Sequence, residues 1–127
     1  MNEQRTPTGR ELDILKVLWE YGPASVRVVF QHLNTQRIKD LAYNTVQTLL
    51  RIMEDKGLVT HHVEGRTFIY QPCFSRDDSA VHFLDRVFDS SAAELVQSLL
   101  RREKVSPAEL EQMWAMIAAA RGNNSRC

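Results

Sequence analysis

The sequence predicts a mostly α-helical fold with one small β-hairpin, followed by a helical lobe. Apolar residues recur at helical spacing in three successive segments before residue 57. Two short stretches rich in β-branched and aromatic residues follow, with turn residues between them. Three more segments with helical periodicity occupy the rest of the chain. The 127 residues, 43% of them hydrophobic, suffice for one domain or two small lobes.

The first two helices are predicted from their caps. Thr8 and Glu11 have the spacing of a capping box, and Gly22-Pro23 ends the first helix. Ser25 caps the second helix. The apolar faces comprise Leu12, Leu15, Leu18 and Trp19 in the first helix, and Val26, Val29, Phe30 and Leu33 in the second.

The third helix, within residues 42–56, has two contrasting faces. Its apolar stripe comprises Val46, Leu49, Leu50 and Met53. Its opposite face is polar and comprises Asn44, Thr45, Gln47, Thr48 and Arg51. Gly57 is placed to end this helix in a left-handed cap.

The hairpin consists of strands over residues 59–63 and 67–70, with Glu64-Gly65-Arg66 as the turn. Three short helices followed by such a hairpin have the order of a winged helix-turn-helix domain, which we place at residues 1–72. In that fold the third helix enters the major groove of DNA. Its polar face therefore predicts a DNA-binding surface.

The polar side chains have the chemistry that base reading requires, because amides and hydroxyls both donate and accept hydrogen bonds. Asn44, Gln47 and Thr48 are assigned to base edges or mixed contacts, and Thr45 and Arg51 to phosphates or bases. Arg66, at the hairpin tip, is assigned to a phosphate or the minor groove. A polar helix face is more often simply solvated, and some winged helices bind proteins instead. These readings stay open as alternatives.

The net charge does not indicate nucleic-acid binding, since 16 Lys and Arg balance 16 Asp and Glu. A single N-terminal domain should therefore bind double-stranded DNA weakly, so that dimerisation matters. Residues 73–121 are predicted to form a helical dimerisation domain, in which helices begin at Ser75, Ser91 and Ser106. The residues predicted to form a homodimer interface are Leu84, Val87, Phe88, Leu95, Leu99, Leu110, Trp114 and Ile117. The alternative is that these helices fold back onto the N-terminal domain. Residues 122–127 are predicted to be a disordered tail.

The segment YNTVQTLLRIMEDKGLV, with GPASVRVV before it and GRTFIYQP after it, resembles the penicillinase and methicillin-resistance repressor family, which includes copper-responsive repressors. The resemblance rests on Thr45, Val46, Thr48, Leu50, Arg51, Lys56 and Gly57, and extends over residues 8–121. It implies a homodimeric transcriptional repressor that binds a palindromic operator with TACA-like and TGTA-like half-sites.

The resemblance also implies how repression could be relieved. Its β-lactam-responsive members are cleaved at an Asn-Phe bond after a signal from a membrane sensor-protease. No Asn-Phe pair occurs in this chain, so a sensor-protease partner would have to use another bond. Copper-responsive members carry a C-terminal Cys-x-Cys cluster, whereas this chain has Cys127 alone.

Other function classes receive little support. The four histidines predict no metal site, because the adjacent His61 and His62 would point to opposite faces of a strand and the other two are distant in sequence. Cys73 and Cys127 are too far apart in the sequence to suggest a disulfide framework. No phosphate loop, nucleophile elbow or His-x-Glu signature is present, so we predict neither an enzyme nor a cofactor. The lack of an apolar segment long enough to span a membrane favours a cytoplasmic protein. A small-molecule-responsive regulator with a ligand site near Phe88 or Trp114 stays an alternative.

Overall fold

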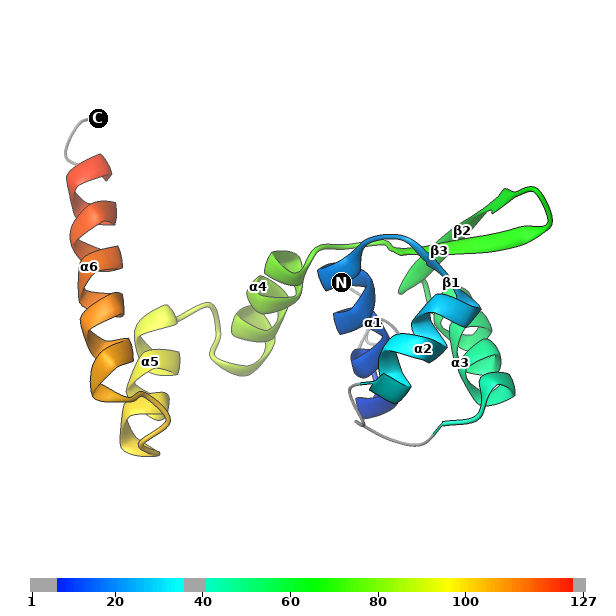
Figure 1. Ribbon diagram of the computed structural model, residues 1–127. Coiled ribbons are helices and arrows are strands. Elements are labelled where there is room, and N and C mark those ends of the chain that lie inside the picture. Colours follow the sequence, from blue (N-terminus) through cyan, green and yellow to red (C-terminus); the bar gives the residue numbers. More distant parts are fainter. Residues whose placement is uncertain (1–6, 36–40, 125–127) are drawn as a thin grey trace. The chain divides into compact units, whose positions relative to one another are not determined.

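The computed structural model describes residues 7–35 and 41–124 (Figure 1). The mostly helical fold with a small sheet is confirmed. The chain divides into two compact units, Met1–His82 and Phe83–Cys127. In chain order the elements are α1 (Gly9–Tyr21), β1 (Ala24–Ser25), α2 (Val26–Thr35), α3 (Tyr43–Asp55), β2 (Val59–Glu64), β3 (Thr67–Pro72), α4 (Arg76–Val87), α5 (Ala92–Arg101) and α6 (Pro107–Asn124).

The start of α1 has the predicted capping box. The backbone N–H of Glu11 donates to the Thr8 hydroxyl at 3.3 Å, and the N–H of Thr8 donates to the Glu11 carboxylate at 2.9 Å. The apolar face differs from the prediction, because Leu12 is 38% exposed whereas Ile14 and Val17 are fully buried. The buried face is wider than a single stripe because α2, α3 and β3 all pack against α1.

The strand β1 was not predicted. It has only two residues, too few to show an alternating pattern, and pairs Ala24 with Tyr70 and Ser25 with Ile69 of β3. The helix α2 follows it directly, and the Ser25 hydroxyl accepts the N–H of Val28 at 3.2 Å, as the predicted cap requires. The strand β1 thereby joins the start of α2 to the sheet.

The end of α3 is fixed by the predicted glycine. Gly57 has φ +81°, a conformation that glycine adopts without steric cost. The N–H of Gly57 donates to the carbonyl of Glu54 at 3.0 Å, and that of Leu58 donates to the carbonyl of Met53 at 2.9 Å. These two hydrogen bonds form a Schellman motif. The buried Leu58 then leads directly into β2.

The sheet has the order β1-β3-β2 and is antiparallel. We call the β2–β3 hairpin the wing. Its two-residue loop, Gly65 and Arg66, is one residue shorter than predicted because Glu64 pairs with Thr67 and belongs to β2. All the buried apolar residues described lie in the first unit: Ile14, Leu15, Val17, Leu18, Ala24, Val26, Val29, Leu33, Val46, Leu50, Met53, Leu58, Val59 and Tyr70.

One buried carboxylate joins α1 to the end of α3. Glu11 is 1% exposed, and both of its carboxylate oxygens accept from Lys56 Nζ, at 2.9 and 3.0 Å. Thus Glu11 serves both as the capping-box residue of α1 and as the partner of the C-cap residue of α3.

Replacing Glu11 by Gln should lower the free energy of unfolding by about 2 kcal/mol. Gln can retain the hydrogen bond to Thr8 but removes the charge that Lys56 faces. Urea denaturation measures this change. The matched control is Glu20→Gln, at an exposed position of the same helix, which should change stability by less than about 0.5 kcal/mol. Equal effects of the two substitutions would contradict a role for the buried pair.

The three later helices begin at their predicted caps. Ser75, Ser91 and Ser106 accept the N–H groups of Asp78, Glu94 and Glu109, at 3.0, 3.2 and 3.1 Å respectively. Among the described residues, no helix is both long and apolar enough to cross a membrane.

The predicted disordered tail is corrected in part. The helix α6 continues to Asn124, so residues 122–124 are helical, because the alanines and the arginine at 118–121 are strong helix formers. The rest of that tail, residues 125–127, lies outside the described part of the chain. The predicted domain boundary after residue 72 stays a prediction.

Candidate nucleic-acid interface

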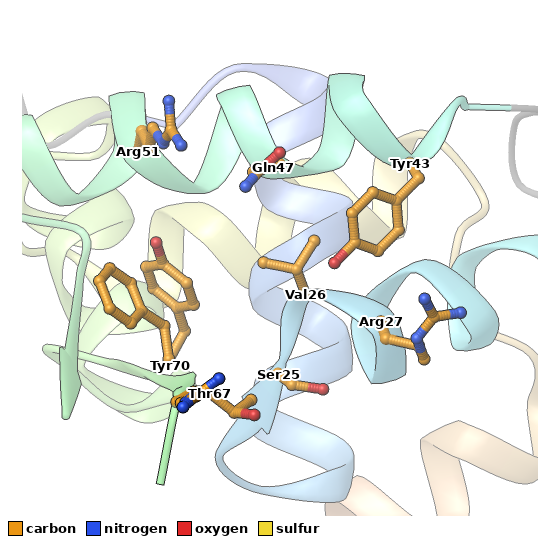
Figure 2. A pocket seen from close by; sticks show the side chains of 10 residues that line it. Ser25, Val26, Arg27, Tyr43, Gln47, Arg51, Thr67 and Tyr70 are labelled. Atoms are coloured by element: carbon orange, nitrogen blue, oxygen red, sulfur yellow. The ribbon is translucent and has the colours of Figure 1, made fainter. Parts of the chain in front are cut away.

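A groove lies between α3, the start of α2 and the wing (Figure 2). We call it the recognition groove. Residues from four elements and the wing loop line it: Ser25, Val26, Arg27, Tyr43, Gln47, Arg51, Arg66, Thr67, Phe68 and Tyr70. The short strand β1 helps to form this groove, since it pairs with β3 immediately before α2 begins.

The predicted polar face of α3 falls into two parts. Gln47 and Arg51 line the recognition groove together with Tyr43, and their i, i+4, i+8 spacing places the three residues along one side of the helix. Asn44 and Thr48 are exposed on the adjacent surface of α3. The structure thus gives the helix a groove side and an outer side, both polar.

The remaining two predicted residues differ in their surroundings. Arg66 is exposed in the wing loop and lines the recognition groove, as its position in the sequence indicated. Thr45 is half-buried and does not line the groove, so it is less accessible than Asn44 or Thr48.

Arg27 and Tyr43 of the recognition groove were not predicted as site residues. The Arg27 guanidinium lies 5.5 Å from the centre of the Tyr43 ring, which in turn packs edge-on against Phe30 at 5.6 Å. In Figure 2 the Tyr43 ring points from α3 toward Val26. A basic residue in the first turn of α2 was the available signal, but only folding brings that turn next to α3.

The recognition groove is locally basic although the chain has no net charge. Arg27, Arg51 and Arg66 come from three different segments, and no carboxylate is among the lining residues. A concave surface lined by charges of one sign concentrates the field and attracts anions. The start of α3 adds to this field, because its N-cap residue Ala42 supplies no side-chain hydrogen bond to the first turn.

Tyr70 lies at the inner end of the wing and is 2% exposed. Its hydroxyl points toward α3 (Figure 2). Burial raises the pKa of Tyr70, the negative charge of Glu54 raises it further, and the positive charge of Arg51 acts in the opposite direction. The phenol therefore stays protonated and can donate a hydrogen bond in the groove.

Three of the histidines, His32, His61 and His62, lie against other side chains. His61 and His62 pair with Glu54 and Glu64, each at 2.8 Å, and His32 stacks on Tyr21 with ring centres 3.9 Å apart. Within residues 7–35 and 41–124, no three metal-ligating side chains come close enough to hold an ion together.

Comparison with known proteins identifies the family. The model of the penicillinase repressor family matches residues 7–119. The chain belongs to the penicillinase repressor family. This result confirms the resemblance inferred from the sequence, and the chain is a winged-helix DNA-binding transcriptional repressor.

Individual members of the penicillinase repressor family are distant in sequence. The penicillinase repressor of Bacillus licheniformis is 26% identical over 111 residues, which cover 84% of this chain and 85% of that protein. The methicillin resistance regulatory protein MecI of Staphylococcus aureus is 22% identical over 107 residues, 81% of this chain and 85% of that protein.

Solved structures agree with the winged-helix fold. The DNA-binding domain of the repressor BlaI matches with a TM-score of 0.52 and 29% identity, covering 61% of this chain and 93% of that domain. The monomeric form of Bacillus licheniformis BlaI in complex with the blaP half-operator matches with a TM-score of 0.51, the same identity and the same coverage.

Proposed function

We propose that this repressor acts as a homodimer, in which each winged helix binds one half of a palindromic operator in the promoter region of the genes it regulates. The half-sites are TACA-like and TGTA-like, as the family resemblance implies. The observation that carries the proposal is the recognition groove, where Arg27 of α2 and Arg66 of the wing loop lie beside Gln47 and Arg51 on the groove side of α3. A related BlaI protein is known in complex with a half-operator, which supports the same use of the fold here.

The geometry suggests a division of roles within one half-site. Asn44, Gln47 and Thr48 face base edges in the major groove, where amides and hydroxyls distinguish base pairs. Arg51 and Arg66, together with Arg27, contact phosphates and set the register of α3 on the duplex. Thr45 is half-buried near the start of α3, and we assign it to a contact with a phosphate of the DNA backbone.

Dimerisation through the second unit is supported by its exposed apolar surface. In a single chain Val87 is 55%, Trp114 73% and Ile117 54% exposed. No residue of α5 and no side chain described in α6 is buried. Exposed apolar surface of this extent is typical of a protein interface. We therefore assign Leu84, Val87, Phe88, Leu95, Leu99, Leu110, Trp114 and Ile117 to a homodimer interface.

Relief of repression is assigned to cleavage of the chain by a sensor-protease at a bond other than Asn-Phe. The connection between α4 and α5 suits such cleavage. Asp89 and Ser90 are exposed there and have positive φ values, +50° and +69°, outside any helix or strand. Mass spectrometry of the repressor recovered from induced and uninduced cells tests this assignment. An intact chain after induction would contradict it.

Substituting Arg51 or Arg66 by Ala should weaken binding to a half-site and reduce the slope of log affinity against log salt by about 1 for each phosphate that the variant no longer binds. Fluorescence anisotropy titrations over a range of salt concentrations measure both quantities. Lys16→Ala, which removes an exposed charge on α1, should leave the slope unchanged. An unchanged slope in both arginine variants would exclude these residues from phosphate binding.

A further inference from the structure

A side-chain pair connects α3 to the wing. His61 Nδ1 of β2 lies 2.8 Å from both carboxylate oxygens of Glu54, in the last turn of α3. Because a carboxylate only accepts hydrogen bonds, Nδ1 is the donor. The side chains are 26% and 30% exposed, so the pair is partly shielded from solvent. We call Glu54 and His61 the α3–wing pair.

The α3–wing pair also contacts the second strand of the wing. The His61 ring stacks on Phe68 of β3, with ring centres 4.1 Å apart and planes 13° apart, and lies 5.5 Å from the Tyr70 ring. One imidazole therefore links the carboxylate on α3 to both strands. Two of the rings around it, those of Phe68 and Tyr70, line the recognition groove.

The outer half of the wing has little other support. Strand β1 pairs only with Ile69 and Tyr70, so the hairpin beyond these residues is a two-stranded ribbon. Val63 and Phe68, opposite each other in this ribbon, are 55% and 47% exposed. An isolated two-stranded hairpin is marginally stable in water. Over the described part of the chain, the α3–wing pair is the one hydrogen-bonded side-chain pair that joins α3 to this hairpin.

We propose that Glu54 and His61 are positioning residues for DNA binding, which hold the wing at a fixed angle to α3 and so place Arg66 against the DNA. The inference rests on the proposed function, because it concerns how the two DNA-contacting elements are held relative to each other. A partly exposed pair contributes little to global stability. Its effect on affinity arises because an ordered wing loses less conformational entropy on binding.

The chain contains a matched control for this inference. His62 and Glu64 form a pair with the same 2.8 Å separation, but both residues belong to β2, so their hydrogen bond does not join the wing to α3. Like the α3–wing pair, this second pair consists of one histidine and one glutamate, and its histidine is the next residue along β2 after His61. Replacing His62 breaks this second pair without releasing the wing from α3.

The experiment is a double-mutant cycle on the full chain, read out by anisotropy with a half-site duplex. Glu54→Ala and His61→Phe should each weaken binding roughly fivefold, and the combined variant should bind no worse than either single variant. Arg66→Ala should cost less affinity in the Glu54→Ala background than in the wild type. His62→Phe should leave affinity unchanged, and Asn44→Ala should combine additively with Glu54→Ala.

A second readout needs no DNA. Amide hydrogen exchange over residues 63–68 of the free protein should be faster in Glu54→Ala and His61→Phe than in the wild type, and unchanged in His62→Phe. Equal exchange in all variants, or an Arg66→Ala effect that is the same in both backgrounds, would overturn the positioning role while the proposed function stands. A wild-type protein that prefers no DNA sequence would instead overturn the proposed function.

Discussion

Replacing Ile117 by Asp is expected to convert the repressor into a monomer and to weaken its binding to a full palindromic operator by about 100-fold. A charge at the centre of an apolar interface loses its hydration without gaining a partner. The single chain should tolerate the change, because Ile117 is 54% exposed there. Analytical ultracentrifugation measures the oligomeric state, and titration with full and half operators measures the two affinities.

The matched control for this substitution is Gln112→Asp in the same helix. Helical spacing places Gln112 on the side of α6 opposite Leu110, Trp114 and Ile117. The Gln112→Asp variant should remain dimeric and keep the wild-type affinity for the full operator. Affinity for a half-site should be the same in all three proteins. A wild-type monomer, or an Ile117→Asp variant that is still dimeric, would mean that these apolar faces do not form the dimer interface.

A second large effect, on sequence preference, is expected when one amide is removed from the outer side of α3 and one from its groove side. In the double variant Asn44→Ala/Gln47→Ala, the preference for operator over unrelated DNA should fall by about 100-fold, because each well-placed amide contributes about 1–3 kcal/mol of discrimination. Non-specific affinity and its salt dependence should persist, since the arginines remain. Neither side chain is buried, so the fold should be unaffected.

Gln31→Ala provides the control for the loss of an amide. Gln31 is exposed on α2 and does not line the recognition groove. Competition titrations with operator and unrelated duplexes measure the preference of each variant. If the double variant retains the wild-type preference, the polar face of α3 does not read bases.

Local sequence signals predicted most of the fold. The caps at Thr8, Ser25 and Ser91 and the left-handed Gly57 act over three or four residues, so their hydrogen bonds could be inferred from spacing alone. The two-residue strand β1 could not be predicted, because it is defined by its pairing with β3, more than 40 residues away. The extension of α6 to Asn124 was not predicted, because residues 122–124 have no apolar side chain that would mark them as part of a packed helix.

The candidate site was predicted in part. Gln47, Arg51 and Arg66 were identified from their residue types and spacing, and they do line one groove. Arg27 and Tyr43 were missed because their role depends on how α2 packs against α3, which is a tertiary contact without a local pattern. The α3–wing pair was missed for the same reason. His61 lies seven positions after Glu54 in the sequence, and the Schellman turn between them reverses the chain.

Selection of genomic DNA fragments that bind the purified protein tests whether the polar face of α3 reads a palindromic sequence. The Asn44→Ala/Gln47→Ala variant is carried through the same selection in parallel. We expect the wild type to enrich a palindrome with TACA-like and TGTA-like halves and the variant to enrich no motif. Enrichment of no sequence by the wild type, or of the same palindrome by both proteins, would contradict this expectation.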